Sequence, residues 1–440
     1  MKTIYYFIIL IFLQNCSFDD KTGIWENSSD AVKKTDQFKE FKTLSARAKP
    51  FTKTIRIKEN LRINILNPVE NNYWTDEFFQ SNNNFANFKY NNLELLKLKS
   101  KKITSSEINK HILYDGDKAI INDKKGNIII FSVKENKVLT KFNFYKKKYK
   151  KVKKFLNLII ENNIIYVSDN IGFLYAYNYV DEKLLWAKNY KVPFKSNLKI
   201  SNNKLIAANQ NNNLFFFDKR NGETIKLIPT EETIVKNEFV NNLSMNSKYL
   251  FFLNTYGTLY SIDRKNMQIV WFVNINQSLD LNPSNLFLGS KIINNNEILV
   301  VSSNDFFYVI ETRTGSIKYR KNFSSKIKPL ILDDYIFILT KQNFLICINL
   351  TNGEIVYSYD IDKKISDYLN TKKKSVDFQS FFVANNELII LLSNSFILKF
   401  SLNGELEKVD KLISKINSYP IFVKNSLVYL DNSNRLIITD

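Results

Sequence analysis

The sequence predicts an all-β fold, an eight-bladed β-propeller that is closed by a strand from the N-terminal side. A strand-rich unit of about 44 residues recurs eight times, and its turn residues fall at fixed positions within the unit. A period of this length with strand-like content indicates a propeller rather than a helical solenoid. The units start at Gly126, Gly172, Asn212, Gly257, Asp305, Asn343, Ser395 and Asn434.

Each unit is expected to form a four-stranded sheet whose hairpins are marked by glycine. Gly126, Gly172 and Gly257 open three of the units. A second set follows about ten residues after a unit start, often as Asn-Gly or Thr-Gly, and supplies the positive φ angles that tight hairpins need. Its members are Gly222, Gly315, Gly353 and Gly404.

The two ends of the repeat region predict how the ring closes. The last unit stops at Asp440, directly after its third strand, and therefore lacks an outermost strand. The segment Leu93–Leu98, with the strand-like sequence LELLKL, lies ahead of the first unit and has no partner there. We expect it to complete the eighth blade, which removes the open edges of the ring.

Aromatic residues recur near the end of the outer strand of each unit. Trp186 and Trp271 occupy this position in two units, and Tyr319 and Tyr357 occupy it in two others. A large ring at one phase of a repeat is typical of packing between neighbouring repeats. We therefore predict that these four side chains dock blades and bind no ligand.

The N-terminus is typical of an export signal. Ten apolar residues, Ile4–Leu13, follow Lys2, which is too short a run to span a bilayer as a helix. The pattern Leu13-x-x-Cys16 resembles the lipobox of bacterial lipoproteins, which implies that Cys16 is lipidated; an ordinary signal peptide is the alternative. The expected organisation is a signal peptide at 1–15, a lipid-anchored polar tether at 16–60 and a propeller at 61–440.

Composition excludes several classes of active site. The chain has a single histidine, His111, and two cysteines, Cys16 and Cys347, so a Cys/His zinc site, a Ser-His-Asp triad and a disulfide framework lack their residues. His111 has no catalytic pattern around it and is interpreted as structural or as a surface residue. Cys347 lies in an apolar run and is expected to be buried.

The formal charge is +20, from 63 Lys and Arg against 43 Asp and Glu. Lysine is spread evenly along the chain, which favours a general compositional bias over a dedicated polyanion site, and export argues against nucleic acid as a partner. The run Lys146–Lys154 holds seven lysines in nine residues. We expect it to be a solvated loop between blades; contact with anionic lipid head groups is the alternative.

The repeat resembles that of the pyrroloquinoline-quinone-type (PQQ-like) propellers. The resemblance is clearest in Gly172-FLYAYN with Trp186 and in Gly257-TLYSID with Trp271, and it covers roughly residues 88–440. Quinoprotein dehydrogenases and the outer membrane assembly factor BamB family both use this repeat. The residues around Cys16, and Trp74 ahead of the first strands, resemble the BamB family.

The family resemblance implies a function without chemistry. Quinoprotein dehydrogenases resemble one another in adjacent paired cysteines and acidic calcium ligands, whereas Cys347 stands alone, so we expect no enzyme activity, cofactor or metal. The BamB resemblance implies a lipid-anchored scaffold at the periplasmic face of the outer membrane. A quinone-dependent dehydrogenase, or another envelope-bound interaction propeller, remains the alternative.

The same resemblance implies partners and an interface. The partners would be a BamA-like barrel assembly protein, other subunits of its complex and unfolded outer membrane protein precursors. The contacts would come from inter-blade loops ahead of the third and fourth units, around 191–194 and 236–239. The candidate interface residues are Lys191, Phe194 and Glu238.

Overall fold

The computed structural model describes residues 16–18, 25–27, 51–92, 95–232, 240–276 and 287–440. The chain divides into two units, Met1–Ala48 and Lys49–Asp440. In the first unit, β1 (Cys16–Phe18) pairs antiparallel with β2 (Trp25–Asn27). The predicted signal peptide lies outside the described residues. Among those that are described, no helix has the length and apolar character needed to cross a membrane.

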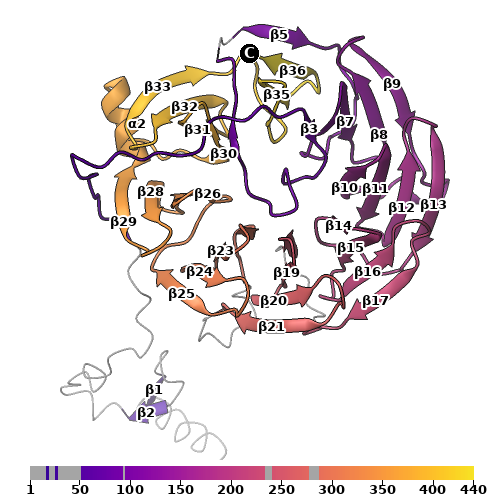
Figure 1. The fold of residues 1–440 in the computed structure, drawn as a ribbon, viewed down its shortest axis with the longest axis horizontal. Helices are drawn as coiled ribbons and strands as arrows, with labels where there is room; N and C mark the ends of the chain where they lie inside the picture. Colours follow the sequence, from indigo (N-terminus) through magenta and orange to yellow (C-terminus); the bar gives the residue numbers. More distant parts are fainter. Residues whose placement is uncertain (1–15, 19–24, 28–50, 93–94, 233–239, 277–286) are drawn as a thin grey trace, which may run out of the picture. The chain divides into compact units, whose positions relative to one another are not determined.

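The second unit is a ring of eight small sheets, which confirms the predicted eight-bladed propeller (Figure 1). Neighbouring strands within a blade are antiparallel, apart from one parallel pair in blade 7. Blade 1 comprises β3 (Tyr73–Trp74), β6 (Leu113–Asp115), β7 (Lys118–Asn122), β8 (Ile128–Ser132) and β9 (Lys137–Phe142), and blade 2 comprises β10 (Leu156–Glu161), β11 (Ile164–Asp169), β12 (Phe173–Asn178) and β13 (Lys183–Asn189). Blade 3 comprises β14 (Lys199–Ser201), β15 (Lys204–Ala208), β16 (Leu214–Asp218) and β17 (Thr224–Ile228), and blade 4 comprises β18 (Asn242–Met245), β19 (Tyr249–Leu253), β20 (Thr258–Asp263) and β21 (Ile269–Asn274).

The other four blades repeat this plan, and one helix, α2 (Ile361–Leu369), lies between blades 6 and 7. Blade 5 comprises β22 (Ile293–Asn294), β23 (Ile298–Ser302), β24 (Phe307–Glu311) and β25 (Ile317–Lys321), and blade 6 comprises β26 (Leu330–Leu332), β27 (Tyr335–Leu339), β28 (Phe344–Asn349) and β29 (Ile355–Asp360). Blade 7 comprises β4 (Asn87–Phe88), β30 (Phe378–Ala384), β31 (Glu387–Leu392), β32 (Phe396–Ser401) and β33 (Leu406–Lys411), and blade 8 comprises β34 (Ile421–Val423), β35 (Ser426–Leu430), β36 (Leu436–Thr439) and β5 (Leu96–Lys99).

The ring closes as the sequence predicts. The N-terminal strand β5 pairs antiparallel with β36, the last strand of the chain, with Leu98 opposite Ile438 and Lys99 opposite Ile437. Figure 1 shows the two strands side by side, β5 in indigo and β36 in yellow. Because the eighth blade takes strands from both ends of the repeat region, this pairing ties the two ends of the ring together.

Burial follows the position of a strand in its blade. The second and third strands are covered on both faces by neighbouring blades and are almost wholly apolar; all five residues of β8 are buried. Outer strands such as β9 face solvent and carry lysine and threonine. This explains the continuous apolar runs in each repeat, which differ from the alternating pattern of a half-exposed sheet.

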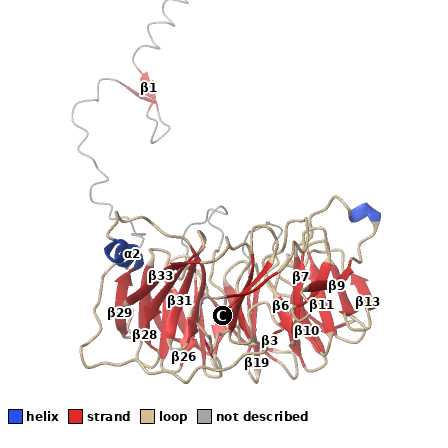
Figure 2. Cartoon of the chain, turned by 90° about the horizontal axis from the view of Figure 1, so that it is seen from above, coloured by secondary structure: helices blue, strands red, loops and turns tan. Residues whose placement is uncertain are grey.

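The ring has two faces, which we name by their loops. The inter-blade face carries the loops that lead from the outer strand of one blade into the innermost strand of the next. The hairpin face carries the turns between the first and second strands and between the third and fourth strands. Figure 2 shows α2 and the short 3-10 turn at Lys147–Tyr149 on the same side, the inter-blade face.

Aromatic side chains join neighbouring blades at the rim. The indole of Trp186 in blade 2 lies over Gly222 of blade 3 and donates from Nε1 to the carbonyl of Lys219 at 3.0 Å. A Cβ placed on Gly222, whose φ is +75°, would lie 2.5 Å from the Trp186 ring. The same contact recurs as Trp271 on Gly315, Tyr319 on Gly353, and Tyr357 together with Tyr359 on Gly404. Each aromatic therefore links one blade to the next.

The propeller unit begins earlier than the predicted residue 61. The backbone of Phe51 donates to the carbonyl of Asn322, and Ile55 forms an antiparallel bridge with Ser358 in the outer strand of blade 6. The last part of the expected tether is thus an added edge on blade 6. The polar composition of residues 51–60 hides this role, because an edge segment needs backbone pairing and few apolar side chains.

Candidate functional site

One segment ahead of the repeats, residues 71–91, crosses the central channel; we call it the hub segment. It includes β3 and β4 and bonds to all eight blades in turn. The contacts, in blade order, are Trp74 opposite Tyr114, Thr75 O with Ile160 N, Asp76 with Lys199, Ser81 O with Met245 N, Asn82 O with Asn294 N, Asn84 with Ile331, Asn87 opposite Val383, and Asn91 N with Asn425 O. It lies on the hairpin-face side of the channel, where Gln80 and Ser81 are exposed.

The centre of the hub segment is held by a buried lysine. Lys199 has no exposed surface, and its ammonium donates to Asp76 Oδ2 at 2.6 Å, to Asn83 Oδ1 at 2.6 Å and to the carbonyl of Gln80 at 3.0 Å. The amide of Asn83 in turn donates to the carbonyls of Leu243 and Ile292, both at 2.9 Å. All three ammonium donors are used, which offsets the cost of burying the charge.

Aromatic rings pack the hub segment against blades 7 and 8. Trp74 is 2% exposed and its ring centroid lies 4.8 Å from that of Phe79 and 5.4 Å from that of Phe85. Phe85 stacks on Phe382 of blade 7 at 4.7 Å. Phe88 is stacked on Phe422 of blade 8 at 5.6 Å between ring centroids. The segment is therefore a built part of the propeller core.

Above the hub segment, on the inter-blade side, lies a cavity of about 730 Å³. The hub segment forms its floor through Trp74, Glu77, Phe78 and Phe85, and every blade contributes to its wall near the start of the innermost strand. Tyr419, which is 38% exposed, lines it together with exposed Lys110 and Asp377. A cavity of this size and mixed lining is typical of a ligand site.

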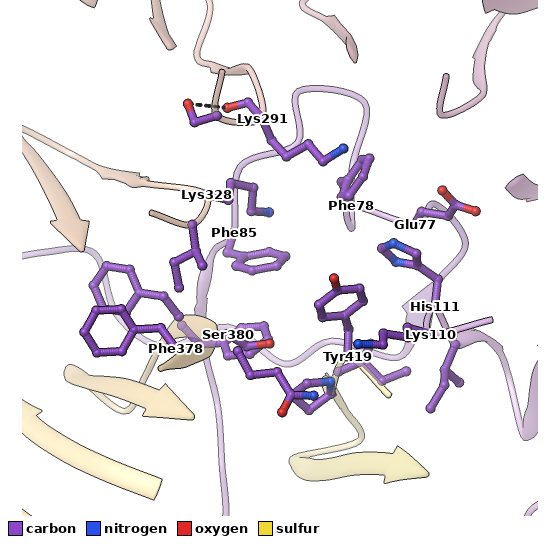
Figure 3. Close-up of a pocket in the computed structure, with 18 of the residues that line it drawn as sticks. Glu77, Phe78, Phe85, Lys110, His111, Lys291, Lys328, Phe378, Ser380 and Tyr419 are labelled. Carbon is purple, nitrogen blue, oxygen red and sulfur yellow. Dashed lines mark hydrogen bonds between the residues drawn. The ribbon is translucent and has the colours of Figure 1, made fainter. Parts of the chain in front are cut away.

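The lining is rich in lysine. Lys291 and Lys328 extend over the floor, with their ammonium nitrogens 4.8 Å from the centroid of Phe78 and 3.1 Å from that of Phe85 (Figure 3). Burial lowers the pKa of Lys291 to about 8. It also lowers the pKa of Lys328, and the nearby charge of Lys199 adds to the effect.

Two other titratable groups of the lining, Glu77 and His111, favour their neutral forms at pH 7. Burial raises the pKa of the Glu77 carboxyl to about 8, against the backbone amide of Leu158, which donates to Glu77 Oε1 at 2.9 Å. Burial and the neighbouring Lys291 lower the pKa of His111 to about 3. The His111 ring packs edge-on against Phe78 and beside Tyr419. The remaining carboxylate of the lining, Asp377, pairs with Lys326 at 3.0 Å.

The fold and its repeat are those of a known group of proteins. Residues 152–359 match the family model described as outer membrane protein assembly factor BamB. The structure is similar to the crystal structure of BamB from Moraxella catarrhalis, with a TM-score of 0.61 and 12% sequence identity over 78% of this chain and all (100%) of that chain. The chain is thus similar to BamB in both its repeat and its fold.

Other solved propellers share the fold alone. A computationally designed protein, Ika8, aligns with a TM-score of 0.59 and 11% identity over 78% of this chain and 99% of its own. The C-terminal WD40 domain of Sif2 aligns with a TM-score of 0.55 and 10% identity over 78% of this chain and 97% of its own. No curated protein sequence matches the BamB-like chain.

Two of the predicted interface residues, Lys191 and Phe194, lie in the loop ahead of blade 3, on the inter-blade face. Lys191 is exposed and has a positive φ of 63°. Phe194 is 3% exposed and packs against Tyr190, Phe215 and Phe217. Its ring fills the core beneath the loop, and a direct partner contact by Phe194 stays a prediction. Glu238 lies outside the described residues.

The structure also places three other residues that the sequence analysis singled out, namely Cys347, Lys154 and His111. Cys347 is fully buried, and burial raises the pKa of its thiol. In the run Lys146–Lys154 most side chains are exposed, but Lys154 is 1% exposed and donates to the carbonyl of Tyr149 at 2.5 Å, so this lysine is not solvated. His111 lines the cavity, a position that the sequence did not indicate.

The cavity does not fit the catalytic centre of a quinoprotein dehydrogenase. The described residues contain no group of three or more His, Cys, Asp or Glu side chains that could hold a metal ion. Glu77 and Asp377 are the acidic residues of the lining, and both already have partners, while Cys347 lies inside blade 6. We derive no redox step through a quinone for these residues.

Proposed function

We propose that this chain is a non-catalytic scaffold lipoprotein of the outer-membrane β-barrel assembly machinery. It docks on the periplasmic domains of a BamA-like protein, acts with other subunits of that complex and assists the insertion of outer membrane proteins. The BamB-type repeat match and the eight-bladed fold support an assembly-factor role. Anchoring through a lipid on Cys16, at the periplasmic face of the outer membrane, is part of the same proposal.

The observation that carries the choice of surface is the charge of the inter-blade face. The described parts of its eight inter-blade loops contain 21 lysines and six acidic residues. The hairpin face carries both signs in similar numbers, with Asp333 and Asp334 against Arg220 and Lys265 as examples. A rigid ring with one strongly cationic face favours steered docking of an acidic partner surface through that face.

Native co-purification tests the docking surface. Lys191→Glu should reduce the amount of a BamA-like protein that co-purifies with the full-length chain several-fold, while the thermal unfolding temperature stays unchanged, because an exposed loop side chain contributes little to stability. Lys265→Glu is the matched control, since Lys265 is an exposed lysine in a hairpin of the opposite face. Equal loss in both variants would contradict docking through the inter-blade face.

The anchor and the absence of chemistry have their own tests. Cys16→Ser should move the folded protein from the outer-membrane fraction to the soluble periplasmic fraction, measured at high salt so that partner binding does not retain it.

Quinone-dependent dehydrogenase activity after addition of pyrroloquinoline quinone and calcium would overturn the scaffold proposal in favour of an enzyme. Recovery of no barrel-assembly component by the anchored protein would favour another envelope-bound propeller.

A further inference from the structure

The cavity floor places two ammonium groups over two aromatic rings. Lys291 enters from the loop ahead of blade 5 and Lys328 from the loop ahead of blade 6, while Phe78 and Phe85 rise from the hub segment (Figure 3). Both lysines line the cavity and keep part of their side-chain surface exposed. Lys328 spends one donor on the carbonyl of Asn83 at 2.6 Å. A lysine ammonium has three donors, which leaves two for a ligand.

The acidic groups nearby are committed elsewhere. Asp76 pairs with Lys199 below the floor at 2.6 Å, and Asp377 pairs with Lys326 at the wall at 3.0 Å. Glu77 accepts from the backbone of Leu158, and its raised pKa leaves it largely protonated at neutral pH. The floor therefore brings two lysine side chains together in a partly desolvated place, where a bound anion would favour their protonated, positively charged forms.

We propose that this cavity binds a small organic oxyanion, namely a carboxylate or a phosphate carried on an apolar body about the size of one or two rings. The oxyanion lies between the ammonium groups of Lys291 and Lys328, where charge-assisted hydrogen bonds are strongest. The apolar body packs on Phe78 and toward Phe378 of blade 7 and Tyr419 of blade 8, which line the same cavity (Figure 3). This site goes beyond the scaffold role and does not rest on it.

The aromatic rings of the floor explain why the proposed ligand carries an apolar body. Inorganic anions are strongly hydrated and gain nothing from the rings, whereas a ring system removes apolar surface from water on both sides. The volume of about 730 Å³ lies within the usual range for sites that enclose such molecules. An apolar cation of the same shape meets two ammonium groups of its own sign.

Isothermal titration calorimetry of the full-length protein with four probes tests the site. We expect 1-naphthoate and 1-naphthyl phosphate to bind at least tenfold more tightly than 1-naphthylmethylammonium. Inorganic phosphate should bind more weakly than either of the two naphthyl anions. The stronger of the two naphthyl anions identifies the head group as carboxylate or phosphate, and both results support the site. Equal binding of the naphthyl cation would overturn the proposal.

Variants connect the binding to the two lysines. Lys291→Met with Lys328→Met should weaken binding of the better anion at least tenfold. The matched control Lys415→Met changes an exposed lysine of the same face and should leave the affinity unchanged. Unchanged affinity in the folded double variant would refute the assignment.

A measurement on the unchanged protein covers the case in which the double variant does not fold. Addition of the better naphthyl anion should slow amide hydrogen exchange in the hub segment and in residues 289–291 and 326–328, which line the cavity. Protection confined to the outer strands, or to the hairpin face, would place the ligand elsewhere and would overturn the proposal.

Discussion

The hub and the rim of this propeller hold the same eight blades together by different means. At the rim, one contact is repeated: an aromatic ring of one blade rests on a glycine of the next, as with Trp186 on Gly222 and Trp271 on Gly315. At the hub, a single segment bonds to each blade through different groups, and its centre is the ion pair of Lys199 and Asp76. The rim contact recurs from blade to blade, whereas the hub combines buried polar bonds with an aromatic cluster and does not repeat.

This difference has energetic consequences. A rim contact loses packing area when its ring is removed, and the loss is local to two blades. The hub contacts are buried hydrogen bonds and charges, so removing one partner leaves others unsatisfied. Damage at the hub should therefore cost more per side chain than damage at the rim, and three measurements test this comparison.

The largest effect is expected at the buried lysine of the hub. Lys199→Ala leaves the carboxylate of Asp76, which is 5% exposed, without its cation and should lower the free energy of unfolding by about 3–5 kcal/mol. Urea denaturation measures the loss. Lys226→Ala, at an exposed position of the outer strand β17, is the control and should change stability by less than about 0.5 kcal/mol. Similar effects of the two substitutions would contradict a hub role for the ion pair.

A smaller loss is expected at the rim. Trp271→Ala removes a half-buried ring and its hydrogen bond to the carbonyl of Thr312, and should lower the free energy of unfolding by about 2–3 kcal/mol. The adjacent Phe272 is 68% exposed, so Phe272→Ala should cost less than about 1 kcal/mol. If Trp271→Ala proves as costly as Lys199→Ala, the contrast between hub and rim fails.

The smallest effect is a pH dependence at the cavity floor. Burial raises the pKa of Glu77 to about 8 in the folded protein from 4.5, so its contribution to stability is complete below about pH 4.5 and is lost as the pH rises toward 8. Glu77→Gln keeps an acceptor for the amide of Leu158 and cannot ionise. Between pH 6.5 and pH 8 the wild-type protein should lose about 1–2 kcal/mol of stability relative to the variant.

Parallel urea denaturation curves of the two proteins at both pH values measure this difference. Titrations common to wild type and variant largely cancel in it. A constant difference between the two proteins across this range would show that Glu77 ionises normally in the fold.

The periodic features of the protein were predictable because the same residue pattern recurs in each repeat. Eight phased units, glycines at two phases and aromatics at one phase determine the number of blades, the hairpins and the candidates for contact between blades. The pairing of β5 with β36 followed from counting strands, since one unit lacked a strand and one strand lacked a unit. The loop that carries Phe194 was expected to be at the surface, whereas the ring of Phe194 turns inward.

The hub segment and the cavity came only from the tertiary structure. Residues 71–91 have neither apolar period nor internal repeat, and their sequence is rich in asparagine, which is typical of a loop. Their hydrogen-bond partners lie up to several hundred residues away along the sequence, as with Asn87 and Asn386. No local sequence pattern indicates contacts between residues so far apart in the chain. Lys291 and Lys328 are likewise ordinary loop lysines in the sequence. Their shared cavity exists because ring closure brings the starts of eight innermost strands around one channel.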